Sequence, residues 1–275
     1  MTANFPRIAI LGAGSMGGAI LSGLLESGAT TDGITVTNRT EAKAAVLRSE
    51  RVTSLSSEQD PDANRAALRG ARIVLVAVKP AMVPDLLREL RDDFEPDALI
   101  VSVAAGVTTA TMEELVPHAV FRTMPNTPSI VRRGVTGLAV GSRGTAEETA
   151  LVRALFETVG AVVEVPEDKM NALSTISGSG PAYVFFLIER LTEAARNLGF
   201  DDAQARLMVE QTFLGASELL ASSDVGPEEL RRRVTSPKGT TERAIAEIAT
   251  ADLTAVFDRA TASAIQRAEE MARGE

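Results

Sequence analysis

Hydrophobic positions in the first 165 residues fall into short continuous runs, separated by stretches whose apolar residues recur with helical spacing. A run that is apolar throughout is typical of a parallel strand buried on both faces of a sheet. The predicted strands cover Ile8–Leu11, Ile34–Asn38, Ile73–Val78, Leu99–Val103, Ala119–Arg122, Thr136–Val140 and Ala161–Val165. Because strands and helices alternate, we expect residues 1–165 to form an α/β domain with a doubly wound, mostly parallel sheet.

The pattern changes after Pro166, beyond which no strand is predicted. A long helix is expected from Pro181 to Leu198, with the proline in the first turn, where its missing N–H costs nothing. The run Val184–Ile188 is apolar throughout and reaches every side of that helix. Burial on all sides is simplest when two subunits share one core, although a self-contained bundle fits the same periodicity. Further helices are predicted over 202–221 (capped by Asp201 or Asp202), from Pro227, over 241–248 and over 253–272, so 166–275 is expected to be an all-helical dimerisation domain.

A glycine-rich turn, Gly12-Ala13-Gly14-Ser15-Met16-Gly17, follows the first predicted strand. Gly12 permits a tight turn, Gly14 lets the backbone approach phosphates, and Gly17 lets the next helix pack close to the strand. Unpaired N–H groups at the helix start then face the phosphate charge. The order of strand, turn and helix makes an ordinary glycine-rich turn the less favoured alternative. The motif predicts a Rossmann-type dinucleotide-binding domain.

Composition removes several classes of function. The chain has no cysteine, which excludes disulfides, thiolate metal sites and cysteine nucleophiles. A formal net charge of −9 without a basic run argues against nucleic acid as a partner. No stretch approaches the ~18–20 apolar residues of a membrane span and no signal peptide is visible, so we expect a cytoplasmic protein with no membrane partner. The only histidine, His118, is expected to be structural, and no metal-ligand cluster is present.

The end of the second predicted strand indicates which nucleotide is bound. NAD-specific sites place Asp or Glu there, about 20 residues beyond the glycines, to bind the ribose 2′-hydroxyl. This chain has Asn38-Arg39-Thr40 instead, with no carboxylate to repel a 2′-phosphate. Arg39 offers a planar pair of donors, and Asn38 and Thr40 add hydrogen bonds. We therefore predict NADPH as the cofactor, with NADH weaker; a solvated Arg39 without a ligand is the less favoured alternative.

Two further strand ends are candidates for the cofactor site, because ligands of open α/β sheets bind beyond the carboxyl ends of the strands. Ala77-Val78-Lys79-Pro80 ends one strand, and Lys79 either supports the cofactor phosphates or ribose or faces solvent. Ser102-Val103-Ala104-Ala105-Gly106 ends the next strand. Its small side chains either leave space for a nicotinamide ring or permit close packing of helix on sheet.

Three other segments combine stiff or small residues with polar side chains. Met124–Pro128 and Ser177–Pro181 are predicted loops, with an ordinary turn as the alternative to a functional role for each. In Val234–Glu242, Thr240 or Thr241 is expected to begin a helix. The start of that helix is either a plain N-cap or a site where N–H groups and hydroxyls bind an anion such as a substrate carboxylate.

Together these segments resemble pyrroline-5-carboxylate reductases over nearly the whole chain. The resemblance is carried by the glycine motif and by Ala77–Pro80, Ser102–Gly106, Arg122–Pro128, Ser177–Tyr183 and Val234–Thr241, the last three being specific to that family. It implies hydride transfer from NADPH to the C=N carbon of 1-pyrroline-5-carboxylate, which yields L-proline. It also implies a helical domain interlocked between two subunits, as a homodimer, with dimers assembled into a larger ring, a decamer.

The resemblance also implies where the substrate binds. It lies beside the loop Ser236–Thr241, where the Thr241 hydroxyl contacts the ring nitrogen. Backbone groups near Gly239 and Thr240 hold the carboxylate, and Asp224 matches an acidic position on the substrate side.

The same resemblance assigns cofactor contacts to Asn64, Asn126 and Pro181. One position departs from the family pattern, because Lys238 replaces the first glycine of a Ser-Pro-Gly-Gly sequence. A positive φ at Lys238 costs about 1 kcal/mol or more. Its side chain either reaches the substrate carboxylate or faces solvent in a tolerant turn.

Two other functions stay open on sequence alone. A β-hydroxyacid dehydrogenase has the same two-domain plan, but it relies on a catalytic lysine in the long helix after the sheet, which residues 181–198 lack. A non-catalytic NADP-binding regulator has the glycine motif without turnover. An imine reductase is favoured because a ring nitrogen that arrives protonated needs little acid–base help from the protein.

Overall fold

The computed structural model describes residues 3–272, which form two compact units. The first unit runs to Ser179 and also takes in the chain from Ile265 onward, and the second is Gly180–Ala264. Residues 166–179, which the sequence analysis placed in the helical half, pack with the sheet: Met170 shares a small core with Met124 and Ala139.

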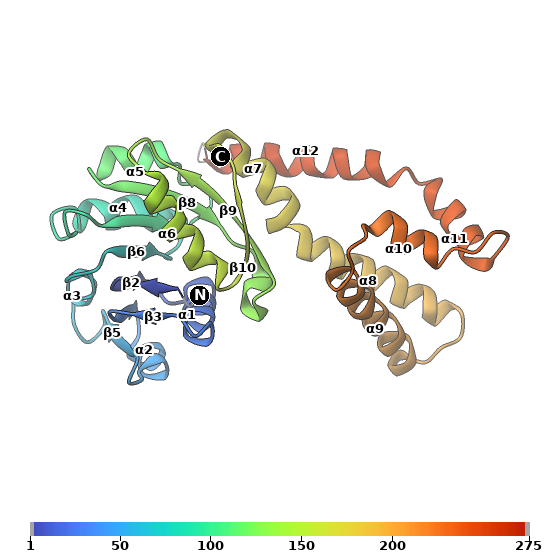
Figure 1. Cartoon of the computed structure of the whole chain (residues 1–275), viewed down its shortest axis with the longest axis horizontal. Coiled ribbons are helices and arrows are strands. Elements are labelled where there is room, and N and C mark those ends of the chain that lie inside the picture. Colours follow the sequence, from blue (N-terminus) through green and yellow to red (C-terminus); the bar gives the residue numbers. More distant parts are fainter. Residues whose placement is uncertain (1–2, 273–275) are drawn as a thin grey trace. The chain divides into compact units, whose positions relative to one another are not determined.

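The first unit is built on a sheet of eight strands in the order β10-β9-β8-β7-β6-β2-β4-β5 (Figure 1). All neighbouring strands pair in parallel except β8 and β9, which are antiparallel. The predicted doubly wound, mostly parallel sheet is therefore confirmed. The strands are β2 (Ile8–Leu11), β4 (Ile34–Asn38), β5 (Val52–Ser56), β6 (Ile73–Val76), β7 (Leu99–Ser102), β8 (Ala119–Met124), β9 (Gly134–Val140) and β10 (Gly160–Glu164).

Helices cover both faces of this sheet, which explains its continuous apolar runs. In β2, Ile8 and Ile10 face one core, and Ala9 and Leu11 face the other. The first core is closed by α1 (Ser15–Glu26) and α6 (Ala146–Glu157). The second is closed by α3 (Ala63–Leu68), α4 (Val83–Glu89) and α5 (Thr109–Leu115). A parallel strand with a core on each side buries successive residues, which favours a continuous apolar run such as that of β2.

Three strands were not predicted from the sequence: β5 and the short pair β1 (Asn4–Phe5) and β3 (Thr30–Thr31). β5 lies at the edge of the sheet, and its residues alternate between buried Val52, Ser54 and Ser56 and more exposed neighbours. Serine at two of the three inward positions weakens the apolar signal of the strand. The short helix α2 (Glu41–Leu47) lies between β4 and β5 in the chain.

The loop predictions for Met124–Pro128 and Ser177–Pro181 are wrong in part. Met124 ends β8, and Thr127 opens a 3₁₀ turn, η2 (Thr127–Val131). The second segment follows the short helix α7 (Met170–Leu173) as a π-helical turn, η4 (Ser174–Gly178), and runs into α8 at Gly180. The Asn126 side chain donates a hydrogen bond to the Ser177 carbonyl (2.8 Å), which connects the residue before η2 to η4.

A buried ion pair fastens the chain that follows the sheet. Arg122 of β8 is 3% exposed and lies 2.5 Å from a Glu167 carboxylate oxygen in η3 (Glu167–Lys169). The other Glu167 oxygen accepts from the Thr109 hydroxyl, and Arg122 also donates to the Asn171 side chain. Because a buried charge without its partner is costly, these contacts hold the start of the helical segment against β8.

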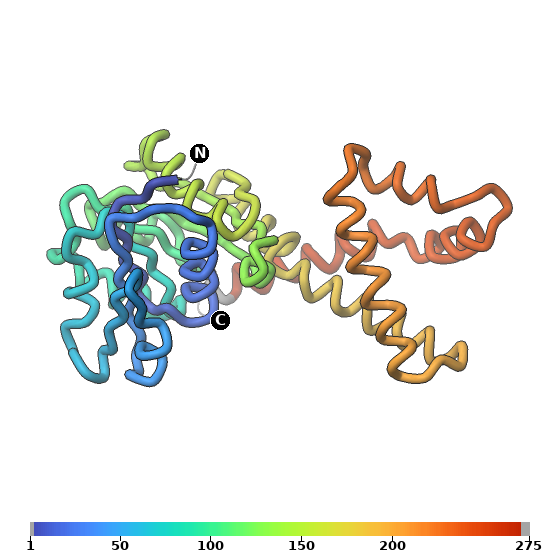
Figure 2. The backbone as a smooth tube through the Cα atoms, turned by 60° about the horizontal axis from the view of Figure 1, so that its bottom comes forward, coloured from blue at the N-terminus to red at the C-terminus, as the bar shows by residue number. Residues whose placement is uncertain are grey.

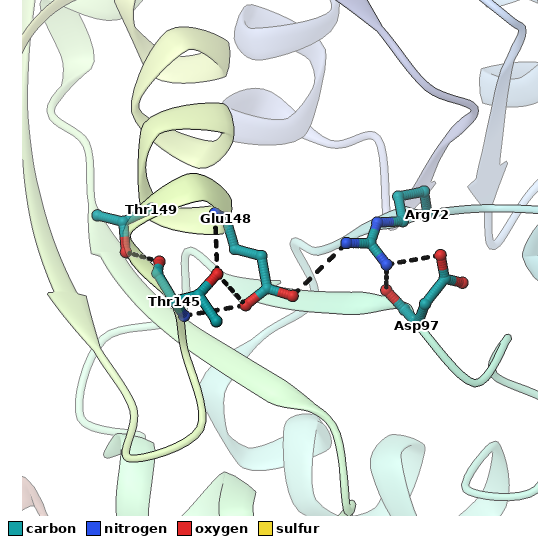
Figure 3. Close-up of polar contacts among 5 residues, drawn as sticks. All are labelled: Arg72, Asp97, Thr145, Glu148 and Thr149. Carbon is teal, nitrogen blue, oxygen red and sulfur yellow. Dashed lines mark hydrogen bonds and ion pairs between the residues drawn. The ribbon is translucent and has the colours of Figure 1, made fainter.

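The amino-terminal end of the sheet is tied to α6 by a polar cluster (Figure 3). Thr145 and Glu148 form a capping box, in which each side chain accepts a hydrogen bond from the other residue's backbone N–H. Glu148 also pairs with Arg72, just before β6, and Arg72 pairs with Asp97, just before β7. One guanidinium thus connects the helix cap to two strand starts.

The second unit contains α8 (Gly180–Asn197), α9 (Asp202–Ala221), α10 (Pro227–Arg233) and α11 (Thr240–Ala249), and α12 (Leu253–Ala272) begins in it (Figure 2). These bounds confirm the predicted helices to within a few residues. Asp201 caps α9 through a capping box with Gln204, as the sequence indicated. No strand follows Pro166 within the described residues.

The helices of the second unit do not bury the apolar run of α8. Val184, Phe185, Phe186 and Leu187 are 45%, 61%, 57% and 43% exposed. This exposure does not agree with a self-contained helical bundle and favours the alternative in which two subunits share one core.

None of the helices described between residues 3 and 272 is long and apolar enough to cross a lipid bilayer. The cytoplasmic location stays a prediction.

We expect Thr145→Ala to lower the free energy of unfolding by about 1 kcal/mol, because α6 loses its side-chain cap. Thr145→Ser keeps a hydroxyl acceptor and should stay within about 0.5 kcal/mol of the native protein. Urea denaturation followed by circular dichroism measures both. Equal losses in the two variants would show that the methyl packing of Thr145 matters and its cap does not.

Candidate functional site

A cleft of about 820 Å³ lies where β2, β4, β5 and β6 end. It is positioned at the switch point of the sheet, because the strand order runs outward in opposite directions from β2 and β6. Its lining residues are Gly12, Gly14, Asn38, Arg39, Thr40, Lys43, Ser57, Glu58, Ala77, Val78, Lys79 and Met82. Eight of the twelve were predicted from sequence; Lys43, Ser57, Glu58 and Met82 were missed.

Three glycines shape the mouth of this cleft in the predicted way. Gly12 has φ +92°, and a Cβ there would lie 3.0 Å from the Ala77 carbonyl oxygen. At Gly17 a Cβ would lie 2.8 Å from the Gly12 carbonyl oxygen, so only glycine lets α1 pack this closely. A Cβ on Gly14 would meet no protein atom within 4 Å. The space over Gly14 is thus open for a ligand.

The start of α1 suits a negatively charged ligand. Gly14 is its N-cap and forms no side-chain cap bond, and the first turn holds no acidic residue. The backbone N–H groups of Gly12 and Ala13 are already used by the Thr37 carbonyl (3.1 and 2.9 Å). The exposed Ser15, partly buried Met16 and buried Gly17 follow in the first turn, whose N–H groups lack helical acceptors.

The other end of the cleft carries two unpaired cations. Neither the Arg39 guanidinium nor the Lys43 ammonium forms an ion pair or hydrogen bond with another described residue. Asn38 is 6% exposed, and its Nδ2 has no hydrogen-bond partner in the described chain. A buried amide donor normally has a partner, so this one is available to a ligand. Thr40, the N-cap of α2, makes no side-chain cap bond.

One premise of the cofactor prediction was wrong. The end of β4 lacks a carboxylate, but Glu58 from the loop after β5 lines the same cleft as Arg39. Local sequence around residue 38 could not reveal this acid, because strand pairing and not chain proximity brings it there. The end of the cleft that holds Arg39 and Lys43 therefore also contains an anionic residue.

The next two strand ends differ in their surroundings. Lys79 is exposed, lines the cleft and has no ion pair among the described residues, and Pro80 begins a 3₁₀ turn (Pro80–Met82). Ala104 packs in the core, which bears out the close-packing alternative for that residue. Ala105 and Gly106 are exposed, and a Cβ on Gly106 would meet no protein atom within 4 Å.

Among the predicted cofactor residues outside the cleft lining are three that the family resemblance assigned, Asn64, Asn126 and Pro181. Asn64 is in the first turn of α3, and Pro181 is the second residue of α8. Asn126 is buried, with its Oδ1 accepting from the Val135 N–H (2.8 Å) and its Nδ2 donating to Ser177. These bonds give Asn126 a structural role, and cofactor contact by the three residues stays a prediction.

The candidate substrate loop lies in the second unit. α11 starts at Thr240 with Gly239 as its N-cap and without a side-chain cap bond, so Thr240 and Thr241 do not act as ordinary caps. Thr241 is partly buried in the first turn. At Gly239 a Cβ would displace the Ser236 hydroxyl and would lie 3.0 Å from the Ser236 carbonyl oxygen, so a larger residue fits only if the serine moves.

Lys238 adopts the left-handed conformation that the sequence analysis considered, with φ +61°. Its backbone N–H donates to a Glu242 carboxylate oxygen at 2.8 Å, which offsets part of the cost. Its side chain is exposed. Asp224 is exposed in the bend between α9 and α10. Substrate contact by both residues stays a prediction.

His118 is 8% exposed and packs edge-on against Phe94. Its Nε2 lies 3.1 Å from the Glu95 carbonyl oxygen. Burial lowers the pKa of the imidazole, so the ring stays neutral at physiological pH. These contacts agree with the predicted structural role.

Both units are similar to known proteins. A family model described as pyrroline-5-carboxylate reductase dimerisation matches residues 167–271, and one described as NADP oxidoreductase coenzyme F420-dependent matches residues 7–106. The pyrroline-5-carboxylate reductase of Pseudomonas aeruginosa is 35% identical over 97% of this chain and 97% of its own length. The Coxiella burnetii enzyme structure superposes with a TM-score of 0.88 at 37% identity, covering 96% of this chain and 97% of that one.

A more distant structure, a Plasmodium falciparum pyrroline carboxylate reductase with NADP bound, has a TM-score of 0.78 at 23% identity. It covers 97% of this chain and 98% of that one, and at this identity it supports the fold alone.

Gly14→Ala and Gly17→Ala should impair different properties, NADP binding in the first variant and folding stability in the second. Because the added methyl at Gly14 meets only open space, we expect unfolding stability to stay near native, while NADP affinity falls at least about tenfold through a clash with the approaching pyrophosphate. Gly17→Ala should instead lower unfolding stability by about 1–3 kcal/mol, because its methyl meets backbone. Thermal unfolding and calorimetric NADP titration test the pair, and unchanged NADP affinity in Gly14→Ala would contradict the proposed approach.

Proposed function

Because the chain belongs to the pyrroline-5-carboxylate reductase family, we propose that its N-terminal cleft selects NADPH over NADH and that the loop Ser236–Thr241 binds the substrate. The chain has pyrroline-5-carboxylate reductase activity, an oxidoreductase activity of proline biosynthesis. It carries an NADP-binding domain and a dimerisation domain. The hydroxyacid dehydrogenase and the non-catalytic regulator are thereby set aside.

The observation that carries the cofactor proposal is the unpaired donor set at the end of the cleft. Arg39 and Lys43 offer positive charge without an internal partner, and Asn38 offers a buried amide donor. At the other end, Gly14 and the start of α1 offer N–H groups to the pyrophosphate. The residues therefore fit a dinucleotide with a 2′-phosphate. When bound, NADPH supplies the hydride that the C=N carbon accepts.

Arg39→Leu should weaken NADPH binding about tenfold or more and leave NADH binding within about twofold, because charge-assisted bonds to the 2′-phosphate are lost. Calorimetric dissociation constants for both nucleotides measure the change. Arg69→Leu is the control, since Arg69 is an exposed arginine outside the cleft. Equal loss of NADPH and NADH binding by Arg39→Leu would argue that Arg39 supports the cleft and does not select the nucleotide.

The residues of the loop Ser236–Thr241 bind the substrate and orient its C=N bond. The Gly239 N–H already donates to the Ser236 carbonyl (3.0 Å), so the N–H groups that follow it, beginning at Thr240, hold the carboxylate. The Thr241 hydroxyl orients the ring nitrogen. Support comes from the start of α11, whose first N–H groups lack a side-chain cap. A cyclic imine that arrives protonated at nitrogen needs no strong general acid, which suits a loop of hydroxyls and backbone donors. We further propose that Asp224 and Lys238 contribute charge on the substrate side.

Thr241→Val should lower kcat about tenfold or more while the dissociation constant for NADPH stays within about twofold, because only substrate orientation is lost. Steady-state kinetics and nucleotide titration separate the two effects. Thr250→Val, at the far end of α11, is the matched control. Loss of NADPH affinity in Thr241→Val would refute the placement of Thr241 on the substrate.

We propose a decamer built from dimers as the working assembly. The support is the apolar run of α8, with Phe185 and Phe186 more than half exposed in a chain that carries a dimerisation domain. Light scattering should give a mass close to ten chains of 29.0 kDa. Phe185→Asp should reduce that mass to about one chain, because a charge cannot be buried unpaired in the shared core. A native mass of two chains would exclude the decamer and keep the dimer.

A further inference from the structure

Glu58 reaches the cleft through an extension of strand pairing. Beyond the ends of β4 and β5, the Ser57 N–H donates to the Asn38 carbonyl and the Glu58 N–H donates to the Arg39 carbonyl, both at 3.0 Å. These bonds hold the backbone of Glu58 beside that of Arg39. Both residues line the cleft.

The Glu58 carboxylate has one oxygen in use and one free. Its Oε2 accepts the Glu41 backbone N–H at 3.0 Å, and its Oε1 has no hydrogen-bond partner among residues 3–272. Glu41 is bound to Arg48 by both carboxylate oxygens (2.5 and 2.9 Å) and does not line the cleft. Glu58 is thus the sole acidic side chain lining the described cleft.

The charges around the nucleotide end of the cleft therefore act in opposite directions. Arg39 and Lys43 attract a 2′-phosphate, and no ion pair with Glu58 neutralises either cation. A carboxylate in the same cleft repels that phosphate, and its free oxygen is the acceptor that a ribose 2′-hydroxyl needs. Sites that prefer NAD place such an acid at the end of the second strand of the fold. Here a neighbouring strand provides it.

We propose that Glu58 is a second determinant of cofactor choice, accepting a hydrogen bond from the 2′-hydroxyl of NADH and opposing the 2′-phosphate of NADPH. This inference rests on the proposed binding of the 2′-phosphate by Arg39 and Lys43. The cleft then admits both nucleotides, and the cations set a preference that Glu58 reduces.

A purely structural role for Glu58 makes a different prediction. Its bond to the Glu41 N–H anchors the loop after β5 to the start of α2. Glu58→Gln keeps one oxygen to accept the Glu41 N–H, and it replaces the free carboxylate oxygen with an uncharged NH2 group. Glu58→Ala removes both the charge and the acceptor. If Glu58 is only an anchor, Glu58→Gln behaves like the native protein and Glu58→Ala weakens all nucleotides alike.

The test uses fragments that contain only the adenosine end of the cofactor, so no turnover is needed. Calorimetry compares adenosine 2′,5′-bisphosphate with adenosine 5′-monophosphate on the full chain. Glu58→Gln should bind the bisphosphate about three- to tenfold more tightly and the monophosphate about two- to fivefold more weakly, the range of one solvent-exposed charge or hydrogen bond. Glu50→Gln, the same charge change before β5 and outside the cleft, should leave both constants unchanged.

The outcomes separate this inference from the proposal it rests on. An unchanged ratio of the two constants in Glu58→Gln, with lost discrimination in Arg39→Leu, overturns the role of Glu58 alone. An unchanged ratio in Arg39→Leu overturns the binding of the 2′-phosphate by the cations. Opposite shifts in Glu58→Gln and Arg39→Leu support both. Thermal unfolding of each variant verifies that the fold is retained.

Discussion

The fold depends on one close approach of backbone to backbone. The turn after β2 passes so near the end of β6 that any side chain at Gly12 would press on the Ala77 carbonyl, and any side chain at Gly17 would press on Gly12 itself. This contact brings the first turn of α1 to the edge of the sheet at the point where the strand order reverses. The cleft, its open floor over Gly14 and its supply of free N–H groups all follow from that approach.

The elements predicted best are those whose burial leaves a strong local pattern. β2, β6 and β7 have cores on both faces, and their continuous apolar runs were recognised in the sequence. β5 was missed because an edge strand that buries serines lacks such a run. The π-helical turn at Ser174–Gly178 was missed for another reason: small residues suggest a loop, and the bond from the Asn126 side chain that supports the helical turn comes from a distant part of the chain.

The residues of the cleft also fall into those that a local sequence pattern predicts and those that it does not. Motif residues such as Gly12, Gly14 and Arg39 were found because the chemistry and spacing of a dinucleotide site are encoded within one strand–turn–helix unit. Lys43 and Glu58 were missed because their place in the cleft is set by the course of α2 and by the pairing of β4 with β5. The acid changes the charge of the cleft, so the motif at the end of β4 describes only some of the charged residues that line it.

The uncovered aromatic face of α8 has a consequence for how this protein behaves as a population of molecules. A chain whose dimerisation domain leaves Phe185 and Phe186 in water has a stability that depends on its own concentration. Dilution therefore favours dissociated subunits and lowers the stability of the fold. Each copy then depends on a second copy for part of its core, so damage to one copy also affects the stability of its partner.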